Sequence, residues 1–91
     1  MDVRNNQQSC RYELVDGDEV VGIGDYRVEG DVVVLPHTEI SPSRRGQGLG
    51  AVLVRGMLDD VSRSGRTVLP ACWFVAEFMD ANPSYQHMLS A

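Results

Sequence analysis

The sequence predicts an α/β (α+β-like) fold: an antiparallel three-strand meander, then a strand–helix–strand crossover, then short C-terminal helices. Three observations lead to this prediction. Residues 10–40 hold β-rich runs separated by tight turn signals, 49–64 has the apolar spacing of a helix, and 66–72 is a further apolar run. Because strand, helix and strand follow one another, the strands at 32–40 and 66–72 are expected to run parallel, with a right-handed connection.

The chain is 91 residues long, and residues 10–91 are expected to form a single domain. Residues 1–9 are polar and lack a signal-peptide core, so a flexible N-terminal leader is expected there. Cys10 and Cys72 are far apart and follow no metal-ligand spacing, which favours free thiols in a cytoplasmic protein over one disulfide.

Charge and hydropathy limit the expected partners. The formal net charge of −5 argues against nucleic acid, whose binding depends on neutralising phosphates with basic side chains. No apolar run approaches the roughly 20 residues that a membrane span needs. We therefore expect no nucleic-acid or membrane partner, and a monomer or weak homodimer.

The meander strands are delimited by turn signals. The first strand, at 10–15, is followed by Asp-Gly-Asp at 16–18, and the second, at 19–28, is followed by Glu-Gly-Asp at 29–31. The third strand occupies 32–40. Together these three runs predict two antiparallel hairpins that share the middle strand.

Glycine and proline inside the strands predict local irregularities. Gly22 and Gly24 indicate a bulge or a close approach of the backbone to another segment. Pro36 cannot donate to a ladder, so it is expected to mark a bulge or a non-bonding edge position.

The helical segments follow. The apolar stripe of the run 49–64 consists of Leu49, Val52, Leu53, Met57 and Val61. Gly65 is a natural stop. The run 73–80 looks helical, and Pro83 suits the first position of a last turn or short helix.

The loop before the main helix is the segment most informative about function. It reads Arg44-Arg45-Gly46-Gln47-Gly48-Leu49-Gly50. Its glycines leave backbone amides uncovered, and amides at a helix start point outward with the positive end of the helix dipole. This favours a phosphate or pyrophosphate site, flanked by two arginines. The alternative is a glycine-rich bend that lets strand and helix pack closely.

Two familiar phosphate loops do not fit. No Gly-Lys-Ser/Thr ends the loop, and the chain contains no lysine. The dinucleotide fingerprint fails at its last glycine and lacks an acidic residue at the ribose distance. The loop instead matches Arg/Gln-x-x-Gly-x-Gly/Ala, the acyl-coenzyme A pyrophosphate loop, and the chain resembles the GNAT acetyltransferases.

Within that superfamily the chain resembles the small single-domain group of predicted N-acetyltransferases that includes the NATD-type proteins. Four segments carry the resemblance in order: His37-Thr38-Glu39-Ile40, Arg45-Gly46-Gln47-Gly48-Leu49-Gly50, Val68-Leu69-Pro70-Ala71-Cys72-Trp73-Phe74-Val75 and Asn82-Pro83-Ser84-Tyr85. The sequence departs from the family pattern at Trp73, which replaces a proline, and at Asn82 and Ser84, which replace His and Glu.

The resemblance implies acetyl-coenzyme A as co-substrate, an amine as acceptor and no metal. It implies that the pantetheine arm pairs with backbone around Glu39 and Ile40, while the pyrophosphate rests on the loop. The implied cofactor-binding residues are Ile40, Arg44, Arg45, Gly46, Gln47, Gly48, Leu49, Gly50 and Ala51.

The candidate catalytic residues are Cys72, Glu39 and His37. Cys72 ends its strand beside the expected thioester, where a thiolate could take the acetyl group and pass it to an amine. It could equally be a buried small apolar side chain. His37 and Glu39 share one face of their strand, so either could accept a proton from the incoming ammonium or help ionise Cys72.

Structural roles compete with these. His37 could hydrogen-bond within the sheet, and Glu39 could pair with an arginine. Tyr85 could protonate the departing thiolate, as a tyrosine does in many GNAT enzymes, or pack at the core or rim. Trp73, Phe74 and Phe78 are expected to form an apolar cluster in the core or a pocket wall.

The sequence thus predicts an acetyl-coenzyme A-dependent N-acetyltransferase, acting directly or through Cys72. The alternative is a non-catalytic acyl-coenzyme A-binding or protein-interaction module, suggested by the small size and by the departures at Trp73, Asn82 and Ser84.

Overall fold

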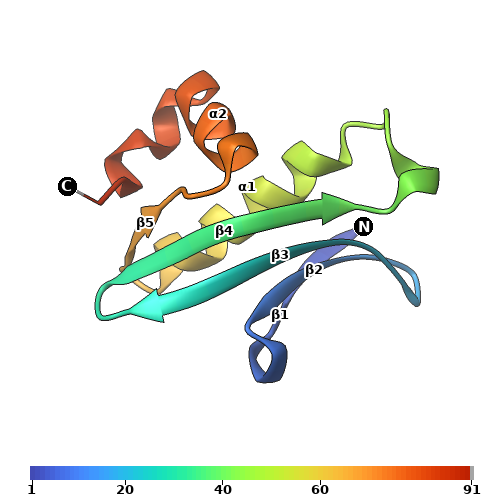
Figure 1. Ribbon diagram of the computed structural model, residues 1–91, viewed down its shortest axis with the longest axis horizontal. Helices are drawn as coiled ribbons and strands as arrows, with labels where there is room; N and C mark the ends of the chain where they lie inside the picture. Colours follow the sequence, from blue (N-terminus) through green and yellow to red (C-terminus); the bar gives the residue numbers. More distant parts are fainter. Residues whose placement is uncertain (91) are drawn as a thin grey trace.

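One five-stranded sheet, in the order β1-β2-β3-β4-β5, organises the chain in the computed structural model, which describes residues 1–90 (Figure 1). Its strands are β1 (Asp2–Asn6), β2 (Arg11–Asp16), β3 (Glu19–Glu29), β4 (Val32–Ile40) and β5 (Thr67–Leu69). The first four pair antiparallel with their neighbours, and β5 runs parallel to β4. The α/β class and the parallel crossover are therefore confirmed, and the antiparallel meander has one more strand than expected.

The helices lie on and beside this sheet (Figure 1). Helix α1 (Leu49–Arg63) contacts all five strands, and α2 (Trp73–Ala81) follows β5. Three short 3-10 helices complete the chain: η1 (Gln7–Ser9), η2 (Pro42–Arg44) and η3 (Pro83–Met88). Within residues 1–90, no helix has the length and apolar character needed to cross a membrane.

The N-terminal segment differs from the flexible leader expected at residues 1–9. It forms β1 and η1, and β1 pairs with β2 along its length, with Asp2 opposite Val15. Strand β1 also packs on α1, because a Cβ at Gly56 would lie 2.5 Å from Cγ2 of Val3. The sequence of this strand lacks a clear apolar alternation. Its position depends on pairing with β2 and on this close contact with α1.

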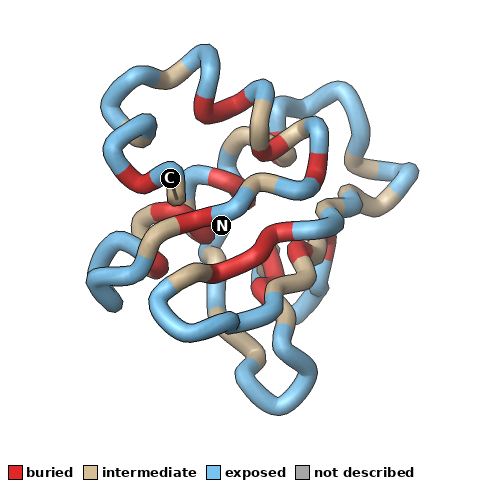
Figure 2. Tube along the Cα trace, turned by 60° about the vertical axis from the view of Figure 1, so that its left-hand side comes forward, coloured by how far each residue is buried: buried red, intermediate tan, exposed pale blue. Residues whose placement is uncertain are grey.

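The core lies between the sheet and the helices, where buried segments gather in Figure 2. The buried residues of α1 are Leu49, Leu53, Val54, Met57, Leu58 and Val61. Val52, expected on the buried stripe, is instead 42% exposed. Burying each large aliphatic side chain contributes about 1.5–3 kcal/mol, so this helix anchors the fold.

The two strand glycines serve close approach. A Cβ at Gly24 would lie 2.5 Å from Sδ of Met57, and one at Gly22 would lie 2.7 Å from Cδ1 of Ile40. The missing side chains therefore let α1 and the end of β4 settle against β3.

Candidate functional site

Strands β4 and β5 pair over only three residues each and then diverge. The last pair is Val34 with Leu69. Pro70 follows Leu69 immediately, and Pro36 lies two residues beyond Val34. Proline has no N–H to donate, so neither strand can extend the ladder past this point.

A bulge in β4 reinforces the divergence. Leu35 and Pro36 together stand opposite the single residue Tyr26 of β3, and such an extra residue bends its strand. This confirms the irregularity expected at Pro36. The backbone N–H of Cys72 still donates to the carbonyl of Leu35, at 2.9 Å, and forms the last backbone hydrogen bond between the two sides within residues 1–90.

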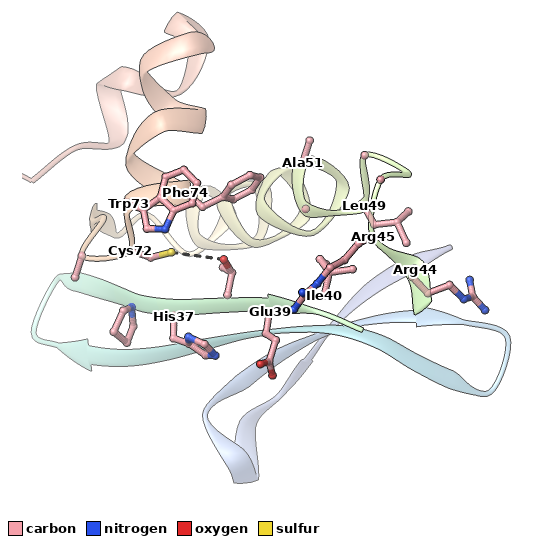
Figure 3. Close-up of a pocket in the computed structure, with 16 residues that line it drawn as sticks. His37, Glu39, Ile40, Arg44, Arg45, Leu49, Ala51, Cys72, Trp73 and Phe74 are labelled. Atoms are coloured by element: carbon pink, nitrogen blue, oxygen red, sulfur yellow. Dashed lines mark hydrogen bonds between the residues drawn. The ribbon is translucent and has the colours of Figure 1, made fainter. Parts of the chain in front are cut away.

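The divergence opens a cavity of about 820 Å³ between β4, the loop and the start of α2 (Figure 3). It is lined by residues 36–40, 44–46, 48–51 and 71–74. All the sequence-predicted catalytic and cofactor-binding residues line it except Gln47. The cavity therefore joins the loop to Cys72.

At the loop end, two glycines keep the backbone amides open. Gly46 and Gly48 have φ values of 83° and 74°, in the left-handed region that favours glycine, and nothing lies within 4 Å of the Cβ that either would carry. Gly48 is the N-cap of α1, with no side-chain cap and no acidic residue in the first turn. The amides at this helix start are thus available to an anion.

The third glycine of the loop has the packing role considered as the alternative. A Cβ at Gly50 would lie 2.8 Å from Cζ of Phe74, so its absence lets α1 and α2 approach. The loop therefore combines an open anion site with a close helix contact.

The two loop arginines differ in their partners. Arg44 donates to Oδ2 of Asp16 at 2.8 Å and to Oε1 of Glu19 at 3.0 Å, which ties η2 to the β2–β3 turn. Arg45 forms no ion pair with any other residue in 1–90. Arg45 is therefore the arginine left with its charge available to an anionic ligand.

The free edge of β4 presents backbone groups to the cavity. The N–H of Ser41 donates to the carbonyl of Val21 at 2.8 Å, so Ser41 faces β3. Because backbone groups alternate along a strand, those of Thr38 and Ile40 point away from β3, toward the cavity. They could pair with an extended ligand as a neighbouring strand would.

Cys72 lies at the far end of the cavity, as the N-cap residue of α2, and is 9% exposed. Its Sγ is 3.5 Å from Oγ1 of Thr38. Burial opposes ionisation, but the hydrogen bond with Thr38 and the nearby amides of Val75 and Phe74 outweigh it, so the pKa of the Cys72 thiol is lowered. The sulfur forms no side-chain capping hydrogen bond with α2. Thr38 is its one side-chain hydrogen-bond partner within residues 1–90.

Sequence reasoning missed Thr38. The period-two rule that placed His37 and Glu39 on one face also places Thr38 on the other, toward the helices. The sequence therefore indicated the face on which Thr38 lies, but only the structure shows that Cys72 lies next to it.

His37 and Glu39 share a face, as expected, but their side chains point away from Cys72 in Figure 3. Both are exposed, and within residues 1–90 neither forms the sheet hydrogen bond or arginine pair considered for it. The expectation that either directly helps to ionise Cys72 does not fit this arrangement.

Tyr85 lies outside the cavity. Its hydroxyl donates to Oδ1 of Asp59 at 2.8 Å and accepts from Nη1 of Arg55 at 3.4 Å, and its ring packs on Phe78. Burial and the bond to Asp59 raise the pKa of Tyr85. The packing role considered for Tyr85 fits these contacts, and a proton-donating role at the thioester does not.

The expected aromatic cluster is divided. Phe78 is buried, whereas Trp73 is 73% exposed at the rim of the cavity, with its ring edge-on to Phe74. Cys10 and Cys72 are both free thiols. Residues 1–90 contain no group of His, Cys, Asp and Glu side chains placed to hold a metal ion.

Known structures share this architecture. A GCN5-like protein from Staphylococcus aureus superposes with a TM-score of 0.73 over 99% of this chain and 88% of its own, at 18% identity. The ribosomal-protein-S18-alanine N-acetyltransferase from Escherichia coli gives a TM-score of 0.66 over 85% of this chain and 54% of its own, at 16% identity. These identities show a common fold.

Sequence comparison gives the family. Protein NATD1 from Bos taurus is 32% identical over 57 residues, and Protein NATD1 from Gallus gallus is 30% identical; each match covers 63% of this chain. The chain spans about half the length of these relatives, 50% and 52%. The family model described as GCN5-related N-acetyl-transferase matches residues 11–88. The chain therefore belongs to the GCN5-related N-acetyltransferase family.

Proposed function

We propose that this chain transfers an acetyl group from acetyl-coenzyme A to an amine. The observation that carries the proposal is one continuous cavity, with the open amides of the α1 start at one end and the thiol of Cys72 at the other. That layout matches a ligand with a diphosphate at one end and a thioester at the other.

The loop end suits the diphosphate. Amides around Gly46 and Gly48 lack covering atoms, and Arg45 offers a forked set of donors. Arg44 is already bound to two carboxylates, so in this proposal it holds the loop in place while Arg45 contacts the anion.

The middle of the cavity suits the pantetheine arm. Its amides can pair with the backbone of Thr38 and Ile40, because that edge of β4 has no neighbouring strand within residues 1–90. In this proposal the arm pairs with Ile40, as expected from the sequence, and with Thr38 in place of the neighbouring Glu39.

At the far end, Cys72 provides a covalent route. Its thiolate attacks the thioester carbonyl carbon; a new carbon–sulfur bond forms, and coenzyme A leaves as its thiolate. A neutral amine then attacks the acetyl carbon and releases the Cys72 thiolate, and the proton of the amine passes to water. His37 and Glu39, at the rim of the cavity, can accept that proton through water.

Mass spectrometry after incubation with acetyl-coenzyme A alone tests the covalent route. The chain has no lysine, so its two thiols are the side chains that a thioester acetylates most readily. In a Cys10→Ser background, we expect one acetyl group on Cys72 and none on the Cys72→Ala variant. A fully active Cys72→Ala variant without any adduct would leave direct attack by the amine as the route.

A panel of amines, with release of free coenzyme A thiol as readout, tests the transfer itself. Turnover with any of them supports the proposal. Intact coenzyme A binding without turnover across a broad panel contradicts it.

That second outcome describes a non-catalytic acyl-coenzyme A-binding module. One arrangement favours this candidate: His37 and Glu39 point away from Cys72, and Tyr85 lies outside the cavity. Calorimetry with coenzyme A and the thiol-release assay together separate the two functions.

A further inference from the structure

Three exposed residues follow one face of α2. Trp73, Glu77 and Asp80 are spaced i, i+4 and i+7, which places them in line on a helix, and we call them the α2 stripe. At 73%, Trp73 is the most exposed large apolar side chain in residues 1–90. One exposed apolar residue is ordinary on a protein surface, so its exposure alone does not indicate a binding site and its position has to be considered.

That position is the rim of the cavity, directly beside Cys72. Figure 3 shows Trp73 next to Cys72, at the end of the cavity away from the loop residues Arg45 and Leu49. The loop end is taken by the diphosphate in the proposed function. The Trp73 end is therefore where an acceptor reaches the thioester.

The loop end carries Arg45, whereas α2, which leads away from the Trp73 end, carries Glu77 and Asp80 and no arginine or lysine. The guanidinium of Arg55 from α1 packs against the same helix, 5.3 Å from the Phe78 ring. Neither carboxylate forms an ion pair with another residue in 1–90. An indole face attracts cations, and a carboxylate one helical turn away adds to that attraction.

The chemistry of acetyl transfer restricts which cationic amines can be the acceptor. The reacting amine must lose its proton before it attacks, so its own charge cannot hold it through the reaction. A second positive charge on the same molecule can stay on the stripe while the first nitrogen reaches the acetyl group. A flexible aliphatic chain between the two charges can lie against the exposed indole.

We propose that Trp73 and Glu77 recognise the acceptor, and that the acceptor is an aliphatic amine of the polyamine class, with a second positive charge. This assignment rests on the proposed function and names its acceptor. Trp73 supplies an aromatic and apolar surface beside Cys72, and Glu77 supplies the charge that selects a dication over a monoamine.

Fluorescence measures this binding directly, because Trp73 is the single tryptophan of the chain. Titration with spermidine at physiological salt is expected to change the emission in a saturable way. n-Butylamine, with one ammonium, is expected to bind several-fold more weakly. Equal responses to both amines, or an emission that does not change as spermidine is added, would overturn the assignment.

Variants separate the stripe from general attraction to an acidic protein. We expect Glu77→Gln to weaken spermidine binding about two- to fivefold, and Trp73→Leu to do the same, with amide shifts of α2 as readout. Trp73→Phe keeps an aromatic face and should stay closer to the parent. Asp31→Asn, in the β3–β4 turn, removes the same charge from an exposed side chain that forms no ion pair within residues 1–90, and should change nothing. An equal loss in Asp31→Asn would mean a non-specific charge effect and would overturn the proposal.

The two proposals fail in different ways. In one case Glu77→Gln leaves spermidine affinity unchanged, while coenzyme A still shifts the amide resonances of Gly46 and Gly48 and acetyl transfer proceeds. The acceptor assignment alone is then wrong. If coenzyme A leaves those amides unmoved and no thiol is released, the transfer function itself is wrong.

Discussion

Oγ1 of Thr38 and Sγ of Cys72 lie 3.5 Å apart, although 34 positions separate the two residues in the chain. Strand β4 brings the hydroxyl to the helix side of the sheet, and the turn into α2 brings the thiol beside it (Figure 3). This contact connects the two walls of the cavity at the point where the proposed chemistry takes place.

Thr38→Val should raise the pKa of the Cys72 thiol. Burial then opposes the thiolate without the hydroxyl that stabilised it, so the thiolate appears only at higher pH. The measurement is the rate of alkylation by iodoacetamide against pH, in a Cys10→Ser background. The midpoint should move upward relative to the parent.

Thr38→Ser keeps the hydroxyl and is the matched control. Its alkylation profile should stay near that of the parent protein. If valine and serine give the same profile, the hydroxyl does not set the reactivity of Cys72.

Arg45→Ala should weaken coenzyme A binding roughly 10- to 150-fold, because a hydrogen bond between charged groups contributes about 1.5–3 kcal/mol. Arg44→Ala should weaken it less, since Arg44 is bound to Asp16 and Glu19 and acts through the loop. Calorimetry measures both affinities.

Pantetheine, which lacks the diphosphate, is the control ligand for this comparison. Its affinity should be the same for the Arg45→Ala variant and the parent. A parallel loss of pantetheine affinity would show that Arg45 shapes the cavity instead of holding the anion.

Gly56→Ala should lower the free energy of unfolding by about 1–2 kcal/mol, although alanine is the better helix former. The added Cβ would lie 2.5 Å from Cγ2 of Val3 and push β1 away from α1. Urea unfolding measures the loss. Val3→Ala in the same chain should restore part of it, as expected for residues in contact; purely additive effects would contradict the packing of β1 on α1.

Glu13→Gln should flatten the acid dependence of stability. The side chain of Glu13 is buried and accepts hydrogen bonds from Asn6, Arg4 and Arg11, which hold the pKa of Glu13 below its ordinary 4.5. Such a carboxylate stabilises the fold above the ordinary value, and that stability is lost as pH falls toward the lower folded value.

Urea midpoints between about pH 6 and pH 3 measure this dependence. Asp31→Asn, at an exposed site without an ion pair within residues 1–90, is the control and should keep the slope of the parent. A parent whose midpoint does not change across this window would contradict the role assigned to Glu13.

The sequence predicted the elements whose signal is local. The bounds of β4 matched at both ends, because Glu29-Gly30-Asp31 and the glycine loop delimit it. Helix α1 begins at Leu49 as expected, since its apolar spacing is regular. Strand β1 was missed because what holds it, the partner strand and the gap at Gly56, lies elsewhere in the chain.

The site followed the same division. The loop glycines carry their conformation in their own residue type, so Gly46 and Gly48 could be read directly. The relation of Cys72 to β4 depends on which face of the strand meets α2. A period-two pattern groups His37 with Glu39 but does not say which face that is, so the partner of Cys72 had to come from the structure.

Pro36, where β4 diverges from β5, has a second consequence, for solubility. A free strand edge is a place where another polypeptide can add and start an aggregate. Pro36 lies at the start of this edge, and the charged Glu39 lies within it, which are two ordinary ways to discourage such addition. Pro36, which helps to open the sheet for a small molecule, therefore also discourages the addition of a second protein chain.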